Sequence, residues 1–119
     1  MPRYIFFIFG KIADFGDWRV GNNVPYRDRE TVYDGEFKSI VEVRKKALQL
    51  LKTRLKNNKY SEIWGIGAWR VGRRSPGEDI RIKYDKDTGK FWTGKNGALV
   101  KVDGTLSNKS IFDVWDERN

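Results

Sequence analysis

Clustered lysines and arginines are the residues of this sequence whose types and spacing could do chemistry. Between Lys38 and Lys59 the chain carries eight cations and one acid, Glu42, whereas the other 97 residues carry 16 cations and 15 acids. At about 100° per residue, five of these cations fall on one side of a helix. This basic stripe consists of Arg44, Lys45, Lys52, Lys56 and Lys59. Cations in a row can follow a phosphate backbone without reading its bases, so the stripe predicts binding to nucleic acid.

The basic stripe also has an ordinary interpretation, because amphipathic helices usually carry charges on their exposed side. Such helices normally mix Glu with Lys, which pair between successive turns. No acid lies between Arg44 and Lys59, and this one-sidedness favours an anionic partner. A second arginine group, Arg70, Arg73 and Arg74, precedes a predicted Pro-Gly turn and predicts a further anion contact.

The absence of two residue types removes most enzyme classes. The chain has no cysteine, so it holds no disulfide or thiolate metal site, and it has no histidine, the commonest general base. Serine–histidine–aspartate hydrolases, thiol proteases and zinc deaminases are therefore excluded as intrinsic activities. We expect a binding module without cofactor or metal rather than an enzyme. The alternative partner is an acidic surface of another protein, docked by an interaction module or inhibitor.

Two carboxylate pairs leave one enzymatic alternative open. They are Asp34 with Glu36 and Asp85 with Asp87. Oxygen ligands suit a hard cation such as Mg²⁺, and a metal-dependent nuclease could combine Asp79, Asp85 and Lys83. Both pairs fall in predicted turns, where Asp is common for backbone reasons, so the turn interpretation is favoured.

A ten-residue pattern, G-x-W-R-V-G-x-x-x-P, occurs twice at a spacing of 51 residues. The copies begin at Gly16 and Gly67, and they predict a duplicated strand-turn-strand unit. Their tryptophans, Trp18 and Trp69, could stack on bases while the neighbouring arginines contact phosphate. A large aromatic beside Val in a strand more often belongs to the core, and this interpretation is favoured.

Periodicity and turn residues predict an α+β fold. Strands are expected at residues 4–9, 31–33, 60–71, 80–84, 91–93 and 98–102, with a turn at Asp34–Gly35. A capping box at Ser39–Glu42 predicts a helix that runs to Asn57–Asn58. Ser110 can cap a short terminal helix. The elements combine into a twisted, largely antiparallel sheet with one long amphipathic helix packed on a face.

Length and hydropathy bound the organisation and location of the chain. A length of 119 residues without a linker-like segment predicts a single domain over 1–119. The apolar run Ile5–Phe9 is far shorter than the ~20 residues that span a bilayer, so we expect no membrane partner. The lack of cysteine does not tie the chain to an oxidising compartment, and the cytoplasm is the expected location.

Overall fold

The computed structural model describes residues 1–12, 29–56, 60–72 and 77–117 of the chain. Seven strands and two helices occur there in the order β1 (Arg3–Ile12), β2 (Arg29–Glu36), α1 (Ile40–Leu55), β3 (Tyr60–Arg70), β4 (Ile80–Asp85), β5 (Lys90–Thr93), β6 (Ala98–Val100), β7 (Leu106–Ser110) and α2 (Ile111–Glu117). The strands form one sheet in the order β2-β1-β3-β4-β5-β6-β7, and every neighbouring pair is antiparallel. The predicted α+β class is confirmed.

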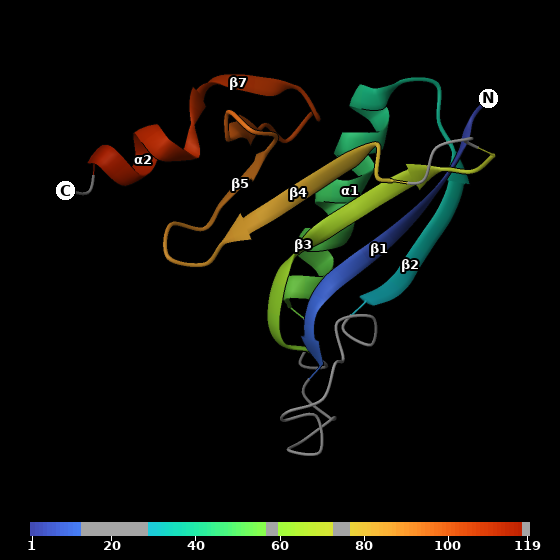
Figure 1. The fold of residues 1–119 in the computed structure, drawn as a ribbon, viewed down its shortest axis with the longest axis horizontal. Coiled ribbons are helices and arrows are strands. Elements are labelled where there is room, and N and C mark those ends of the chain that lie inside the picture. The colour runs from blue at the N-terminus through green and yellow to red at the C-terminus, as the bar shows by residue number, and fades with distance from the viewer. Residues whose placement is uncertain (13–28, 57–59, 73–76, 118–119) are drawn as a thin grey trace.

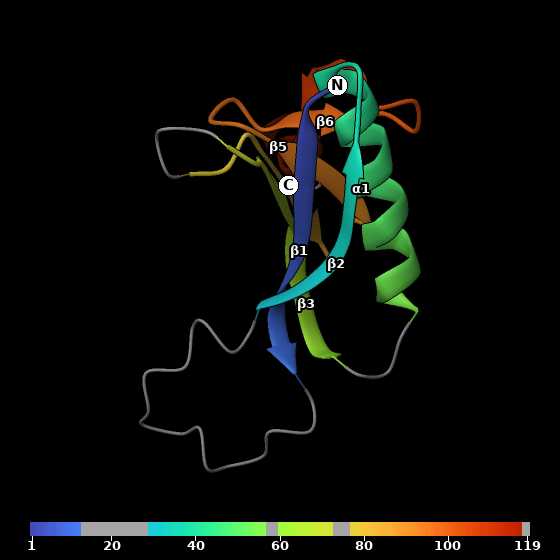
Figure 2. The same ribbon diagram turned by 90° about the vertical axis from the view of Figure 1, so that its right-hand side faces the viewer.

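The connection between β2 and β3 sets the two-layer arrangement (Figure 1). Both strands run antiparallel to β1, which lies between them, so they are parallel to each other and need a crossover. Helix α1 makes that crossover and lies along one face of the sheet (Figure 2). From β3 onward the strands follow one another as a meander.

Helix α1 begins with one of the two hydrogen bonds of the predicted capping box and with a variant of the other. The Glu42 amide donates to Ser39 Oγ at 3.3 Å. The Glu42 carboxylate accepts from the amide of Lys38 at 3.1 Å, one residue before the position that a standard capping box uses. The helix ends at Leu55, and Lys56 caps it through its backbone amide. Residues Asn57 and Asn58, where we expected the helix to stop, lie outside the described residues.

The hydrophobic core lies between α1 and one face of the sheet. Side chains of α1 that are buried there are Val43, Ala47, Leu48 and Leu51. The sheet contributes alternate residues, as expected for a half-buried sheet: Tyr4, Phe6 and Ile8 from β1, Ile66 and Ala68 from β3, and Ile80 and Ile82 from β4. The intervening residues of these strands therefore point to the opposite face, which we call the open face.

Two glycines of β3 let rings from β1 lie flat against the open face. A Cβ atom on Gly67 would collide with the ring of Phe7, and one on Gly65 would collide with the ring of Phe9 and with the carbonyl oxygen of Ile82. The pairing of β1 with β3 is also irregular beside Gly65. The backbone of β4 therefore approaches closely at Gly65, whereas at Gly67 the close neighbour is the ring of Phe7.

The sequence-based turn at Asp34–Gly35 is wrong, because both residues lie inside β2. Asp34 stands opposite Ile5 of β1, and its carboxylate accepts two hydrogen bonds from the guanidinium of Arg3. This cross-strand pair outweighs the local turn preference of Asp-Gly. Strand β7 was not predicted, because its sequence, LSNKS, has no apolar alternation. The strands expected at 80–84 and 91–93 are confirmed as β4 and β5, which pair as a hairpin.

Only residues 67–72 of the repeated pattern lie within the described residues. Its second copy begins at Gly67 in β3 and turns at Gly72, whose φ of 86° lies in the region that favours glycine. The first copy, with Trp18, lies outside the described residues, so the duplication stays a prediction.

The Arg3–Asp34 pair predicts acid sensitivity of the β1–β2 pairing. The hydrogen bond from Arg3 lowers the pKa of Asp34 below its ordinary value. Stabilisation from such a carboxylate is present above its unfolded pKa and is lost as the pH falls through the folded pKa. Denaturant unfolding at pH 6 and pH 3 should therefore show a smaller loss of stability in Asp34→Asn than in the parent. Both groups are exposed, so the difference will be small; equal losses would contradict the expectation.

Candidate nucleic-acid interface

The basic stripe is only partly free for a partner. Lys45, Lys52 and Lys56 are exposed on α1. Arg44 is half-buried, and its Nε donates to the carbonyl oxygen of Gly104 at 2.8 Å. Lys59 lies outside the described residues. Within the described part of the chain, the three exposed lysines form no ion pair with a carboxylate. The stripe is therefore a line of positive charge on the side of the molecule away from the open face.

The loop after β6 explains why Arg44 is engaged. Gly104 has a φ of 88°, and a Cβ atom there would collide with the carbonyl oxygen of Val41 and the backbone of Lys45. The loop thus packs directly on the first turns of α1. The loop therefore places the carbonyl oxygen of Gly104 next to the guanidinium of Arg44, which gives this oxygen a hydrogen-bond donor.

The second arginine group cannot be assembled from the described residues. Arg70 is exposed at the end of β3, and its backbone amide donates to the carboxylate of Asp79. Arg73 and Arg74 lie outside the described residues. The prediction that these three arginines contact one anion stays untested.

The carboxylates do not form the metal site that a nuclease would need. Asp79 precedes β4 and Asp85 ends it, so at about 3.3 Å per residue they are about 20 Å apart and cannot share an ion. The Asp85 carboxylate accepts from the Thr88 hydroxyl at 2.6 Å and from the Trp115 indole at 2.9 Å. No cluster of three acidic residues that could hold a metal occurs among the described residues. The nuclease combination of Asp79, Asp85 and Lys83 is wrong.

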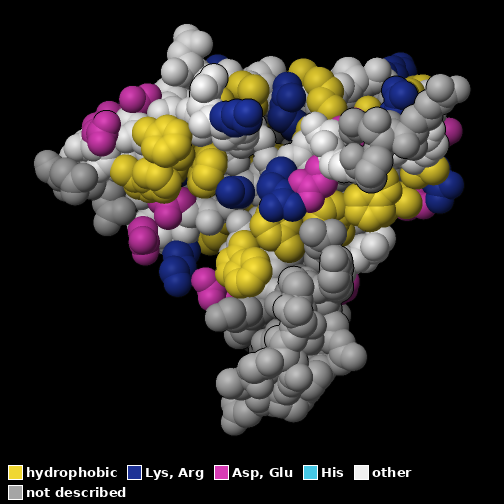
Figure 3. Space-filling view, viewed as in Figure 1, with side chains coloured by type: hydrophobic (Ala, Val, Ile, Leu, Met, Phe, Trp, Pro, Cys, Tyr) yellow, Lys and Arg dark blue, Asp and Glu magenta, His cyan; other side chains and the backbone are white. Residues whose placement is uncertain are grey.

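The open face carries cations between aromatic rings. In Figure 3, Lys and Arg side chains lie over β4 in the middle of this face, with hydrophobic side chains on both sides of them. Arg81 and Lys83 alternate with core residues along β4 and so point outward here. Trp92 of β5 stands directly opposite Lys83 and shares its face. Phe7 is already buried, so the accessible part extends from Arg81 toward Trp92.

Arg81 is held in place on both sides. Its guanidinium lies 4.4 Å from the ring centroid of Phe9. Nε donates to the Glu78 carboxylate at 2.6 Å, and a second guanidinium nitrogen donates to the other oxygen. This hydrogen bonding raises the pKa of Arg81 above its already high ordinary value, so the side chain stays charged. Part of its charge is neutralised by Glu78.

Lys83 and Trp92 form the centre of the site. The ammonium group of Lys83 lies 5.0 Å from the centroid of the Trp92 ring, in a cation–π arrangement. Behind Trp92, α2 supplies two more rings, Phe112 at 6.4 Å and Trp115 at 6.2 Å between centroids. Helix α2 starts at the predicted cap, in which the Asp113 amide donates to Ser110 Oγ at 3.2 Å. The indole of Trp115 ties the helix to β4 by donating to the Asp85 carboxylate.

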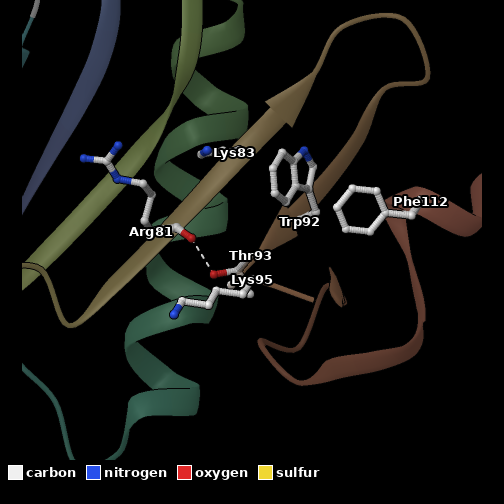
Figure 4. Close-up of a pocket in the computed structure, with 7 residues that line it drawn as sticks. Arg81, Lys83, Trp92, Thr93, Lys95 and Phe112 are labelled. Atoms are coloured by element: carbon white, nitrogen blue, oxygen red, sulfur yellow. Dashed lines mark hydrogen bonds between the residues drawn. The ribbon is translucent and has the colours of Figure 1, made fainter. Parts of the chain in front are cut away.

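A pocket of about 470 Å³ lies at this point of the open face. Its lining consists of Arg81, Lys83, Trp92, Thr93, Gly94, Lys95 and Phe112. Figure 4 shows the rings of Trp92 and Phe112 side by side, and the side chains of Arg81 and Lys95 across from them. The described residues that line the pocket include three cations and no acid, so the pocket suits a ligand that is both planar and anionic.

Sequence reasoning missed most of this site. Lys83 entered only as a nuclease residue, and Trp92, Lys95 and Phe112 were not singled out. The signal for two of them was present: when the expected strands 80–84 and 91–93 pair with Tyr84 opposite Phe91, Lys83 and Trp92 fall opposite each other on one face, as they do across the turn of residues 86–89. The placement of Phe112 depends on how α2 packs, which local patterns do not indicate.

Comparisons with protein-family models, with curated proteins and with solved structures find no match for this chain. Among the described residues, no helix is long and apolar enough to cross a membrane.

Proposed function

We propose that this protein binds single-stranded nucleic acid through the open face of its sheet. The observation that carries the proposal is that Lys83 and Arg81 lie between aromatic rings on the sheet face opposite α1. Proteins that bind single strands combine cations, which follow the backbone, with rings on which bases stack. Binding of this kind depends little on sequence, because every base has a π face.

A single strand fits this face better than a duplex does. The faces of paired bases are hidden inside a duplex, whereas those of a single strand are free to stack on Trp92 or Phe112. Phe112 is 45% exposed despite its size, so an aromatic surface is available at this point. Lys95 and Lys83 are exposed beside it and can neutralise phosphates.

The basic stripe supports the same partner from the other side of the molecule. Its exposed lysines, Lys45, Lys52 and Lys56, follow one side of α1 and can neutralise phosphates, so we assign them backbone contact only. The open face is the primary interface in this proposal, and the stripe is a secondary one.

Two matched charge variants test which face binds. Lys83→Gln with Lys95→Gln removes two exposed lysines from the open face, and Lys45→Gln with Lys56→Gln removes two from the stripe. Binding of a fluorescent single-stranded oligonucleotide is followed by anisotropy at several salt concentrations. The open-face variant should bind more weakly, and its slope of log affinity against log salt should be shallower by about 1.4, because each lost contact contributes about 0.7.

The stripe variant is the control, because it carries the same change in net charge. At about 0.1 M salt the screening length is about 10 Å, so charges on the opposite side of the molecule should affect the open face little. If both variants lose the same affinity for the oligonucleotide, the open face is not the primary interface. If the parent binds no single strand, nucleic acid is not the partner, and an acidic protein surface becomes the leading candidate.

A further inference from the structure

The pocket on the open face has the size of a site for one nucleotide. Small-molecule sites typically measure about 300–1,000 Å³, and this pocket measures about 470 Å³. It lies where β5 ends and the turn at Gly94–Gly97 leads into β6, with Phe112 of α2 as a wall.

The Trp92 ring is accessible to a planar ligand. Its neighbours Phe112 and Trp115 contact it at interplanar angles of 54° and 78°, so neither covers it in parallel as a stacked base would. The group that lies over its face is the end of Lys83, an exposed and flexible side chain. A base can replace that ammonium group and leave it free to pair with the phosphate of the same ligand.

The cations of the pocket match a phosphate group. Lys83 and Lys95 form no ion pair with a carboxylate among the described residues. Arg81 is oriented by Glu78, and the hydroxyl of Thr93 donates to the Arg81 carbonyl oxygen, which ties β5 to β4 beneath the pocket (Figure 4). A terminal phosphate carries about −1.5 to −2 charges at pH 7, which the two free lysines can neutralise.

We propose that this pocket binds one nucleoside monophosphate, with its base against Trp92 and its phosphate between Lys83 and Lys95. The inference rests on the proposed function for its biological setting, since the same pocket would hold one nucleotide of a bound strand. It goes further in predicting that the free mononucleotide binds without a polymer.

Calorimetric titration of the whole protein with three probes tests this pocket. The probes are adenosine 5′-monophosphate, adenosine and inorganic phosphate. The monophosphate should bind roughly tenfold more tightly than either fragment, because only it uses both the ring and the lysines. Lys83→Gln with Lys95→Gln should remove most of the preference for the monophosphate over adenosine, whereas Lys45→Gln with Lys56→Gln should leave that preference unchanged.

The outcomes separate this inference from the proposed function. If an oligonucleotide binds and the monophosphate does not, the pocket inference fails and strand binding stands. If the monophosphate binds and no oligonucleotide does, strand binding fails and the pocket inference stands. Inorganic phosphate that binds as tightly as the monophosphate would show an anion site without base recognition, and this also overturns the inference.

Discussion

Leu51→Ala should lower the free energy of unfolding by about 2–5 kcal/mol. Leu51 has no exposed surface and lies in the middle of the core between α1 and the sheet. Truncation removes its contacts and leaves a cavity that the packed strands cannot fill. Because small domains are stable by only about 5–15 kcal/mol, the loss should be plain in a urea titration followed by circular dichroism.

Leu50→Ala is the matched control for this change. The neighbouring leucine lies on the same helix and loses the same atoms, but its side chain is only half-buried. Effects on helix propensity are equal, so the difference between the two variants reports core packing alone. An unfolding midpoint that moves no more for Leu51→Ala than for Leu50→Ala would contradict the packing of α1 described above.

Trp92→Ala should weaken binding of a single-stranded oligonucleotide by about 1–3 kcal/mol, which is roughly 5- to 150-fold in affinity. The reason is the loss of a stacking surface at the centre of the open face, beside Lys83. Anisotropy titrations at fixed salt measure the effect. The slope against salt should stay the same, because no cation has been removed.

Trp92→Phe separates stacking from folding in this experiment. Phenylalanine keeps an aromatic face beside Phe112 and Trp115, so most of the affinity should return. Thermal unfolding of both variants shows whether α2 stays packed. A Trp92→Ala protein that is folded and binds as tightly as the parent would remove Trp92 from the interface.

Local signals in the sequence predict several elements of this fold correctly. The cap at Ser39 and Glu42 sets the start of α1, and the alternation of residues 80–84 sets β4. The turn expected at Asp34–Gly35 fails, because the partner that keeps Asp34 in a strand is Arg3, 31 residues away. Pairing across such a separation leaves no trace in a local pattern.

The candidate site likewise contains features that local sequence patterns indicate and features that depend on long-range contacts. The sequence identifies the lysines of α1 as a charged side, but Arg44 is engaged by Gly104, which lies 60 residues later in the chain. Conversely, Lys83 and Trp92 meet through a short hairpin and were predictable from it. The rings of Phe9 and Phe112 join the open face only through sheet order and the packing of α2, which tertiary structure alone determines.

The position of β1 between β2 and β3 has a consequence for synthesis of the chain. Its partner β3 follows about sixty residues later in the chain, so one edge of the run Ile5–Phe9 stays unpaired until β3 has left the ribosome. This run is apolar, rich in β-forming residues and free of charge, which are the properties of segments that aggregate. Slow long-range pairing extends the time that it is exposed. Recombinant yield should therefore depend on translation rate and temperature more than the stability of the finished domain would suggest.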